Sequence, residues 1–153
     1  MRVREGMGLK GHWTIEIRKE GELVKTIEVD NQLTAIYRGS ILNQLMGDTA
    51  VDLDIKYLAV GDGDTPATAE DTQLGNERFR SVPTSKTLGD GYVQTIWVLT
   101  IDQANFHIRE IGVFAGDATA TANSGSMLSR IVIDVEKTQN IEVTFIRRDY
   151  VNI

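Results

Sequence analysis

The sequence predicts a mainly β domain, built as an antiparallel β-sandwich or a barrel-like sheet with one substantial α-helix. Short segments of alternating apolar and polar residues recur along the chain, and a period of two is typical of half-buried strands. Turns rich in glycine separate these segments at intervals of about 8–15 residues, a spacing that indicates a sandwich or a barrel. Only residues 31–46 change to the helical period of about 3.6.

Length and composition are those of one domain. The chain has 153 residues, within the ~100–200 residues of a typical domain. We expect residues 1–10, which are charged and rich in glycine, to form a flexible N-terminal arm, and residues 11–153 to form a single β-rich domain. The chain has no cysteine, which excludes disulfides and thiolate zinc sites. No apolar run exceeds four residues, so we expect neither a secretion signal nor a membrane partner.

The first predicted element is a hairpin. Residues 12–18 alternate cleanly, and residues 23–30 return after a turn at Gly21, where glycine supplies the positive φ of a tight hairpin. The side chains expected to point inward are those of Trp13, Ile15, Ile17, Leu23, Ile27 and Val29.

The helix is expected at about residues 31–46. Asp30 or Asn31 can cap its start, because a short side-chain oxygen accepts a hydrogen bond from a free N–H of the first turn. Gly47 can end it in the left-handed conformation. Gly39 costs roughly 1 kcal/mol relative to alanine inside a helix, and we interpret it as a point of close packing against a strand.

The middle of the chain contributes further extended segments. Residues 55–60 form a short apolar strand that leads into a loop over residues 61–74. Residues 78–86 are extended, and Pro83 indicates an edge strand or a bulge. Residues 92–101 form the strongest strand of the chain. Its expected inward residues are Val93, Trp97, Leu99 and Ile101, with Thr95 among them.

The next strand carries an irregularity. Apolar residues alternate in one phase as far as Ile108 and in the other phase from Ile111 onward. A β-bulge at Arg109 and Glu110 would keep both groups inward, because a slip of one residue reverses the face of every side chain. Gly112 would then permit a close neighbour on the outer face. The four apolar residues of this strand are Phe106, Ile108, Ile111 and Val113. If the strand were regular, two of these four would face outward, where a partner subunit could contact them.

Two strands and a loop complete the domain. Residues 115–126 are small and polar and predict a flexible loop, whereas residues 127–135 and 140–146 alternate as strands. The apolar C-terminal end, residues 150–153, is either a last strand or a contact with a neighbouring molecule.

Charge is distributed unevenly. The chain has 16 basic and 22 acidic residues, a net charge of −6, which disfavours a nucleic-acid partner. Residues 48–71 contain seven of the carboxylates and the single basic residue Lys56. The simpler interpretation is a solvated acidic loop. The alternatives are a docking face for a basic partner, with Asp62 and Asp64 as contacts, or a site for a divalent cation.

Few residues are candidates for chemistry. The two histidines, His12 and His107, fall on the polar side of strand patterns and are expected at the surface. Without cysteine, and with no histidine pair on a helix, the sequence predicts no structural zinc site. No Gly-x-Ser-x-Gly elbow of a serine hydrolase is present. Asp52 and Asp54 could in principle serve as the two carboxylates of a glycosidase, although solvent exposure is the simpler account.

The Gly61–Gly63 turn fits neither a calcium loop nor a nucleotide loop. An EF-hand beginning at Asp62 requires an oxygen side chain where Pro66 stands and a glutamate where Gln73 stands. A dinucleotide fingerprint requires its third glycine at the position of Pro66. We therefore predict no catalytic residue, no cofactor, no metal and no small-molecule ligand, and a chain that is not an enzyme.

Two groups of residues carry a resemblance to a known family. The first group is Tyr57-Leu58-Ala59-Val60-Gly61-Asp62-Gly63, Thr65-Pro66-Ala67, Asp71-Thr72, Leu74-Gly75-Asn76-Glu77 and Arg80. The second group is Ile108-Arg109-Glu110-Ile111-Gly112-Val113-Phe114, Met127-Leu128-Ser129-Arg130 and Glu136-Lys137-Thr138. Together with the opening hairpin and helix, their order and spacing over residues 12–148 resemble phage tail-fibre and tail-collar-type structural proteins.

The resemblance implies a role in assembly. It implies a repeated, trimeric component of a phage tail, baseplate or fibre attachment region, or a related capsid decoration protein, made in the host cytoplasm and carried in the virion. Its partners would be other copies of itself and other virion proteins. The loop over residues 115–126 is longer than in such proteins, which leaves the place in the virion open.

Two rival functions are a glycan-binding β-sandwich module and, less favoured, a small hydrolase. The residues expected to contact a partner are Tyr150, Val151 and Ile153 at the C-terminal end, and Asp62 and Asp64 in the acidic loop.

Overall fold

The computed structural model describes residues 8–31, 33–50 and 52–152. Over these residues it contains nine strands in two antiparallel sheets and a single helix, which confirms the mainly β prediction. The sheets stay open, so the fold is a sandwich and not a barrel. The elements are β1 (Gly8–Lys19), β2 (Glu22–Asp30), α1 (Ala35–Leu45), β3 (Tyr57–Gly61), β4 (Glu77–Ser81), β5 (Ser85–Leu88), β6 (Tyr92–Leu99), β7 (His107–Ala115), β8 (Ser126–Glu136) and β9 (Ile141–Asn152).

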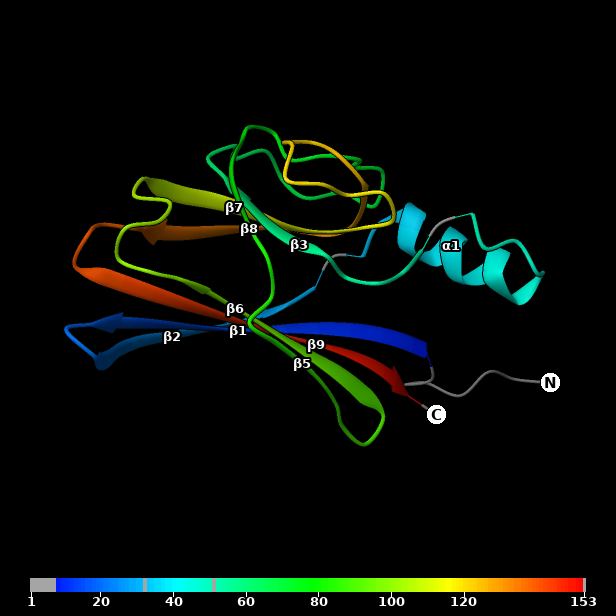
Figure 1. The fold of residues 1–153 in the computed structure, drawn as a ribbon, viewed down its shortest axis with the longest axis horizontal. Helices are drawn as coiled ribbons and strands as arrows, with labels where there is room; N and C mark the ends of the chain where they lie inside the picture. The colour runs from blue at the N-terminus through cyan, green and yellow to red at the C-terminus, as the bar shows by residue number, and fades with distance from the viewer. Residues whose placement is uncertain (1–7, 32, 51, 153) are drawn as a thin grey trace.

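The two sheets lie face to face, with α1 at one end of the sandwich (Figure 1). The five-stranded sheet has the order β2-β1-β9-β6-β5, and the four-stranded sheet has the order β4-β3-β7-β8. Strand β1 begins at Gly8, which pairs with Asn152, so residues 8–10 belong to the sheet and not to the expected arm. The rest of that expected arm, residues 1–7, lies outside the described residues. None of the described helices is long and apolar enough to cross a membrane.

Aromatic residues from three neighbouring strands form the centre of the core. The rings of Trp13 and Trp97 lie 5.9 Å apart, and the ring of Phe145 meets Trp13 edge-on at 6.4 Å. All three are completely buried, as is Leu99, which confirms the inward face expected for Trp97 and Leu99. Val93 and Ile101 were wrongly expected in the core, because Ile101 lies beyond the end of β6 and Val93 lies near the open end of the sandwich.

The opening hairpin forms as predicted, with a two-residue turn at Glu20 and Gly21. Both residues have positive φ, 53° and 81°, as a type I′ turn requires. Register shifts between Ile17 and Arg18. Beyond this irregularity the expected inward residue Leu23 is 51% exposed, since the tip of the hairpin extends past the core.

The helix begins later than predicted, at Ala35. Its cap is Thr34, whose hydroxyl accepts from Tyr37 N at 3.2 Å and donates to Met127 O at 2.7 Å. The predicted caps are held elsewhere: Asp30 ends β2, and Asn31 N donates to Gly11 O at 3.0 Å. These tertiary bonds keep the segment before Thr34 extended.

Two glycines, one inside the helix and one after its last turn, differ in what they contribute. Gly47 follows the last turn with a φ of 87°, as predicted for a glycine that ends a helix. Gly39 has open space where a Cβ would stand, so its interpretation as a point of close packing is wrong.

The extended segment around Pro83 forms two strands. Strand β4 lies at the edge of the four-stranded sheet and β5 at the edge of the five-stranded sheet. Pro83 stands between them, where the chain passes from one sheet to the other, and this position needs no backbone donor for a ladder.

The expected irregularity at Arg109 is confirmed, although the extra residue lies on β8, where residues 133 and 134 stand opposite Arg109. Register shifts between Ile108 and Glu110 opposite β8, and both Ile108 and Ile111 are fully buried within the single chain. Gly112 faces outward against close neighbours: an added Cβ would lie 2.9 Å from Leu74 Cδ2 and 3.1 Å from Met127 Sδ. The final strand, β9, continues as one element as far as Asn152.

We expect Trp97→Ala to lower the free energy of unfolding by about 3–5 kcal/mol, since it removes a fully buried indole from the centre of the core. Denaturant unfolding at equilibrium measures this loss. The matched control is Leu88→Ala, at a side chain that is 85% exposed, which should change stability by no more than about 0.5 kcal/mol. Equal effects of the two changes would contradict the assigned core.

Candidate functional site

The outer face of the four-stranded sheet is covered by two loops. The β3–β4 loop (residues 62–76) and the β7–β8 loop (residues 116–125) lie over this face (Figure 1). Leu74 from the first loop packs there on side chains of the sheet, and Ala118 from the second loop joins them. As a result β7 is buried on both faces over most of its length. The sheet residues of this second apolar cluster are Ala59, Phe114 and Met127.

A buried carboxylate holds the β3–β4 loop in place. Glu110 is fully buried on the outer side of β7. Its carboxylate accepts hydrogen bonds from the backbone N–H of Gly63 at 2.6 Å, of Gly75 at 2.7 Å and of Asn76 at 2.8 Å. A fourth bond comes from Arg130 Nε at 3.0 Å. Four donors match the accepting capacity of a carboxylate, which allows the charge to be buried.

Arg130 extends this bonding to the middle of the loop. Its side chain is 2% exposed, and it donates to Asp71 at 3.1 Å and to Thr65 O at 2.9 Å. Burial raises the pKa of Asp71, but hydrogen bonds from Thr68 and Arg130 outweigh that effect and hold the pKa below its usual range. The loop is therefore tied at its start, middle and end to charges that project from the sheet.

The glycines of the loop are required by this close approach. An added Cβ at Gly63 would collide with the Glu110 carboxylate, and one at Gly61 would collide with Asn76 O. At Gly75 it would lie 3.2 Å from the backbone of Gly63. The Gly-x-Gly turn thus surrounds a carboxylate of its own chain, where a nucleotide-binding loop would surround a phosphate.

A second ion pair fixes the β7–β8 loop. Arg80 Nε lies 2.6 Å from Glu77 Oε2, and their side chains are only 4% and 1% exposed. Arg80 also donates to Thr119 O and Ser124 O, both at 2.9 Å, while Glu77 accepts from Asn123 N at 3.1 Å. The guanidinium lies 4.2 Å from the centre of the Phe114 ring, where a cation–π contact adds to the packing.

The acidic stretch is largely paired within the chain. Asp52 binds Lys56 at 3.2 Å, and Asp54 binds Lys86 at 2.5 Å. Asp62, an expected partner contact, accepts from Asn76 and then Arg78, and these bonds lower its pKa. The other acidic contact, Asp64, has a side chain that is 72% exposed and lies 3.7 Å from Arg109. Over the described residues, His, Asp and Glu form no group of three or more that could hold a metal ion.

The C-terminal contact residues have separate environments. The ring of Tyr150 lies 5.2 Å from that of Tyr92 on the neighbouring strand. Val151 is 64% exposed and pairs in register with Leu9. Ile153, the third residue of this prediction, lies outside the described residues.

A buried polar group that sequence reasoning missed joins α1 to the five-stranded sheet. Arg147 is fully buried and donates to Asp149 at 2.7 and 2.8 Å. Asp149 in turn accepts from the Tyr37 hydroxyl at 3.3 Å, and burial raises the pKa of Tyr37 to about 12. The signal was present in the strand period, because Arg147 and Asp149 are in phase with the inward residue Phe145.

Each histidine lies at the surface, as expected, between two carboxylates of the adjacent strand. His12 on β1 lies 2.5 Å from Glu28 and 3.1 Å from Asp30. His107 on β7 contacts Asp134 and Glu136 in the same manner. The hydrogen bonds to Glu28 and Asp30 raise the pKa of His12, although partial burial opposes them.

We expect Glu110→Gln to lower the free energy of unfolding by about 3 kcal/mol or more, because it removes the fully buried one of the two carboxylates that pair with Arg130. Amide hydrogen exchange at Gly63, Gly75 and Asn76 should also accelerate, because the glutamine side chain has one accepting oxygen where the carboxylate has two. The matched control, Asp64→Asn in the same loop, should have an effect within about 0.5 kcal/mol. Unchanged exchange at all three amides would contradict the assigned role of Glu110.

We expect His12 to stabilise the fold at acidic pH. Its folded pKa is raised above the unfolded value of about 6.5, so the stabilisation is complete below that value and is lost as pH rises through the folded pKa. The difference in unfolding free energy between the wild type and His12→Gln should therefore shrink between about pH 6 and pH 8. NMR titration gives the pKa directly, and Glu28→Gln should shift it downward; a pKa indifferent to that change would contradict the pairing.

Comparison with known proteins places the chain in no family. No family model, no curated protein and no solved structure matches it. Its function has therefore to be inferred from its own residues and their contacts.

Proposed function

We propose that the chain is a non-enzymatic virion structural protein, a repeated component of a phage tail, baseplate or fibre attachment region. One observation carries the proposal: the two groups of residues that resemble tail-fibre and tail-collar-type proteins meet at Glu110. Gly63, Gly75 and Asn76 belong to the first group, and Glu110 and Arg130 belong to the second. The residues that carry the resemblance are thus the residues that hold the β3–β4 loop on the four-stranded sheet.

Other charged residues of the same motifs are also buried. The side chains of Glu77 and Arg80 bind each other and the β7–β8 loop. Lys137 is 1% exposed and donates to Asn105 at 2.8 Å, and burial lowers its pKa. These charges stabilise turns of the chain itself. Motifs of this kind suit a protein whose task is to keep its shape while many copies are joined.

The arrangement of aromatic residues favours assembly over the glycan-binding alternative. Sugar-binding modules stack exposed aromatic rings on their ligands. Trp13 and Trp97 are both fully buried in the core, so neither indole is available for stacking. The proposed partners are further copies of the chain, most simply in a homotrimer, and other proteins of the virion, in which the chain would reside after synthesis in the host cytoplasm.

The proposal predicts that the chain is part of purified particles of the phage that encodes it. Mass spectrometry of those particles should find it in several copies each, and gold-labelled antibodies should mark the tail or its fibre attachment region in electron micrographs. Label on the capsid would replace the tail assignment with a decoration protein. Absence from the particles, together with specific binding on a glycan array, would overturn the proposal in favour of a glycan-binding module.

A further inference from the structure

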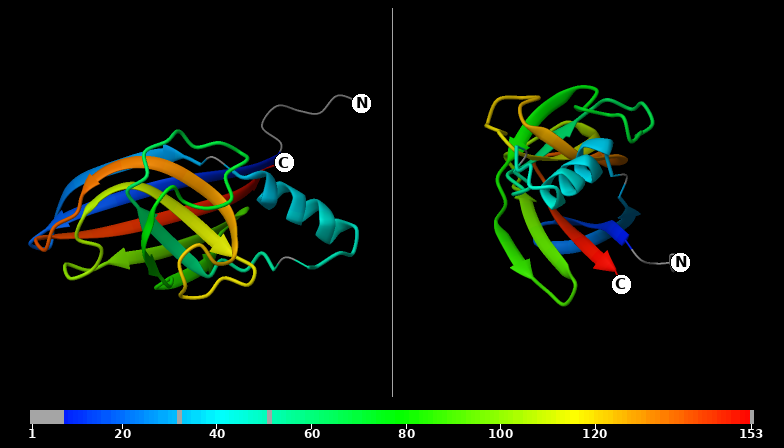
Figure 2. Two further views of the ribbon diagram at one scale, coloured as in Figure 1. Left: turned by 90° about the horizontal axis from the view of Figure 1, so that it is seen from above. Right: turned by 90° about the vertical axis from the view of Figure 1, so that its right-hand side faces the viewer.

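Helix α1 is anchored at its start and projects from the sandwich at its end (Figures 1 and 2). Thr34 and Tyr37 are buried and hydrogen-bonded to β8 and β9. The last turn has the opposite character. Leu42 is 56% exposed, Leu45 is 80% exposed and Met46, just beyond the helix, is 87% exposed. Large apolar side chains at the tip of a projecting helix form an exposed patch that is typical of interaction surfaces.

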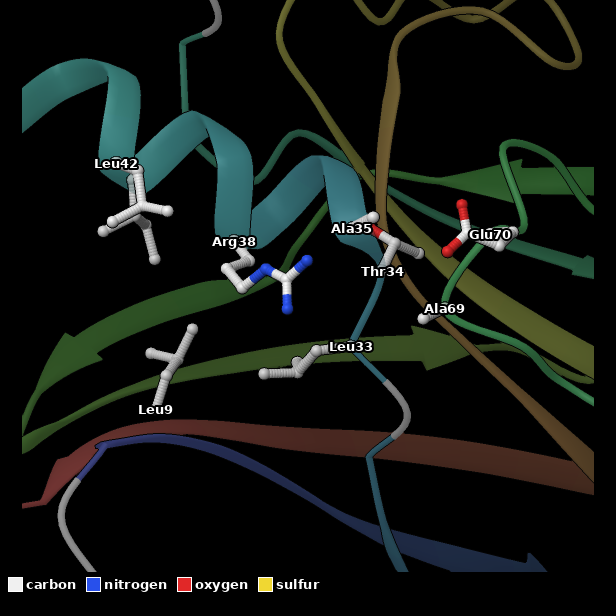
Figure 3. A pocket seen from close by; sticks show the side chains of 9 residues that line it. Leu9, Leu33, Thr34, Ala35, Arg38, Leu42, Ala69 and Glu70 are labelled. Carbon is white, nitrogen blue, oxygen red and sulfur yellow. The ribbon is translucent and has the colours of Figure 1, made fainter. Parts of the chain in front are cut away.

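An apolar groove lies beside the base of the helix. It has a volume of about 600 Å³, and Figure 3 shows Leu9 and Leu33 facing Leu42 across it. Two charged residues also line it, Arg38 from the helix and Glu70 from the β3–β4 loop. Neither forms an ion pair with any described residue. The groove therefore presents apolar walls and one charge of each sign that no described residue pairs.

The surface around the helix differs in charge from the rest of the chain. Of 22 acidic residues, none falls within residues 31–47, where Arg38 is the one charged residue. Two copies of a chain with net charge −6 repel each other over most of their surfaces. The helix itself brings no carboxylate to such a contact, and Glu70, the one carboxylate among the described residues that line the groove, faces a surface whose own charge is Arg38. This pair of opposite charges matches the same pair on a second copy, which favours a second copy as the molecule that covers this face.

We propose that the helix tip of one copy, Leu45 and Met46, docks in the α1 groove of a second copy, and that Arg38 of one copy pairs with Glu70 of the other. This inference rests on the proposed function, because it names the contact through which the repeated component would assemble. A head-to-tail contact of this kind closes into a ring when the rotation between copies permits, as in a trimer. Val151, which pairs with Leu9, extends the surface at the same end of the sandwich.

Size-exclusion chromatography with light scattering of the full chain tests the contact. The wild type should exceed the 17.0 kDa of one copy at micromolar concentration. Leu45→Gln combined with Met46→Gln should weaken association by about tenfold or more, since both side chains would be buried at the contact. Because both residues are exposed in the single chain, the variant should keep the circular dichroism and melting temperature of the wild type. The matched control is Leu88→Gln, at an equally exposed residue of β5.

Charge exchange tests the pairing itself. Arg38→Glu and Glu70→Arg should each weaken association, and the double variant should restore it. An oligomer unaffected by the helix-tip and charge variants would overturn this contact while leaving the proposed function standing. A wild-type chain that stays monomeric yet is found in virions would do the same. Absence of the chain from virions would overturn the proposed function, whatever the behaviour of the groove variants.

Discussion

The buried pair of Glu110 and Arg130 is the interaction on which the outer layer of the molecule depends. A carboxylate and a guanidinium out of water are stable only when their hydrogen bonds are complete, and here loop amides and carbonyls complete them. The loop needs the charges to fix its backbone, and the charges need the loop to replace water. Neither half is stable alone, so the loop and the sheet beneath it form one cooperative unit.

That dependence explains why the four-stranded sheet is apolar on both faces. A sheet in a sandwich normally keeps its outer face polar, but Phe114 and Met127 lie outward beneath the loops. The register shift at Arg109 makes this possible in β7, because it allows Ile108 and Ile111 to point inward while Glu110 and Gly112 point outward. This one shift thus determines both which side chains of β7 enter the core and how the β3–β4 loop is held.

The strands, the opening hairpin and the bulge could be predicted because each leaves a local period in the sequence. The start of the helix could not, since Asn31 is held by Gly11 and Leu33 by a bridge to Ser129, far away along the chain. The role of Glu110 was hidden for the same reason: its donors come from residues 63–76 and 130. The alternation along β9 predicts an inward position for Arg147. Its charge predicts exposure, and the two signals therefore conflict in the sequence.

The passage of the chain at Pro83 has a mechanical consequence. Only residues 82–84 separate the edge strand of one sheet from the edge strand of the other, whereas stacked sheets lie about 10 Å apart. The four Cα–Cα steps from Ser81 to Ser85 span at most about 14 Å when fully stretched. The two sheets are therefore joined along this side by a short covalent link that lets them separate by only a few ångströms. A larger separation of the layers requires β4 or β5 to detach from its sheet.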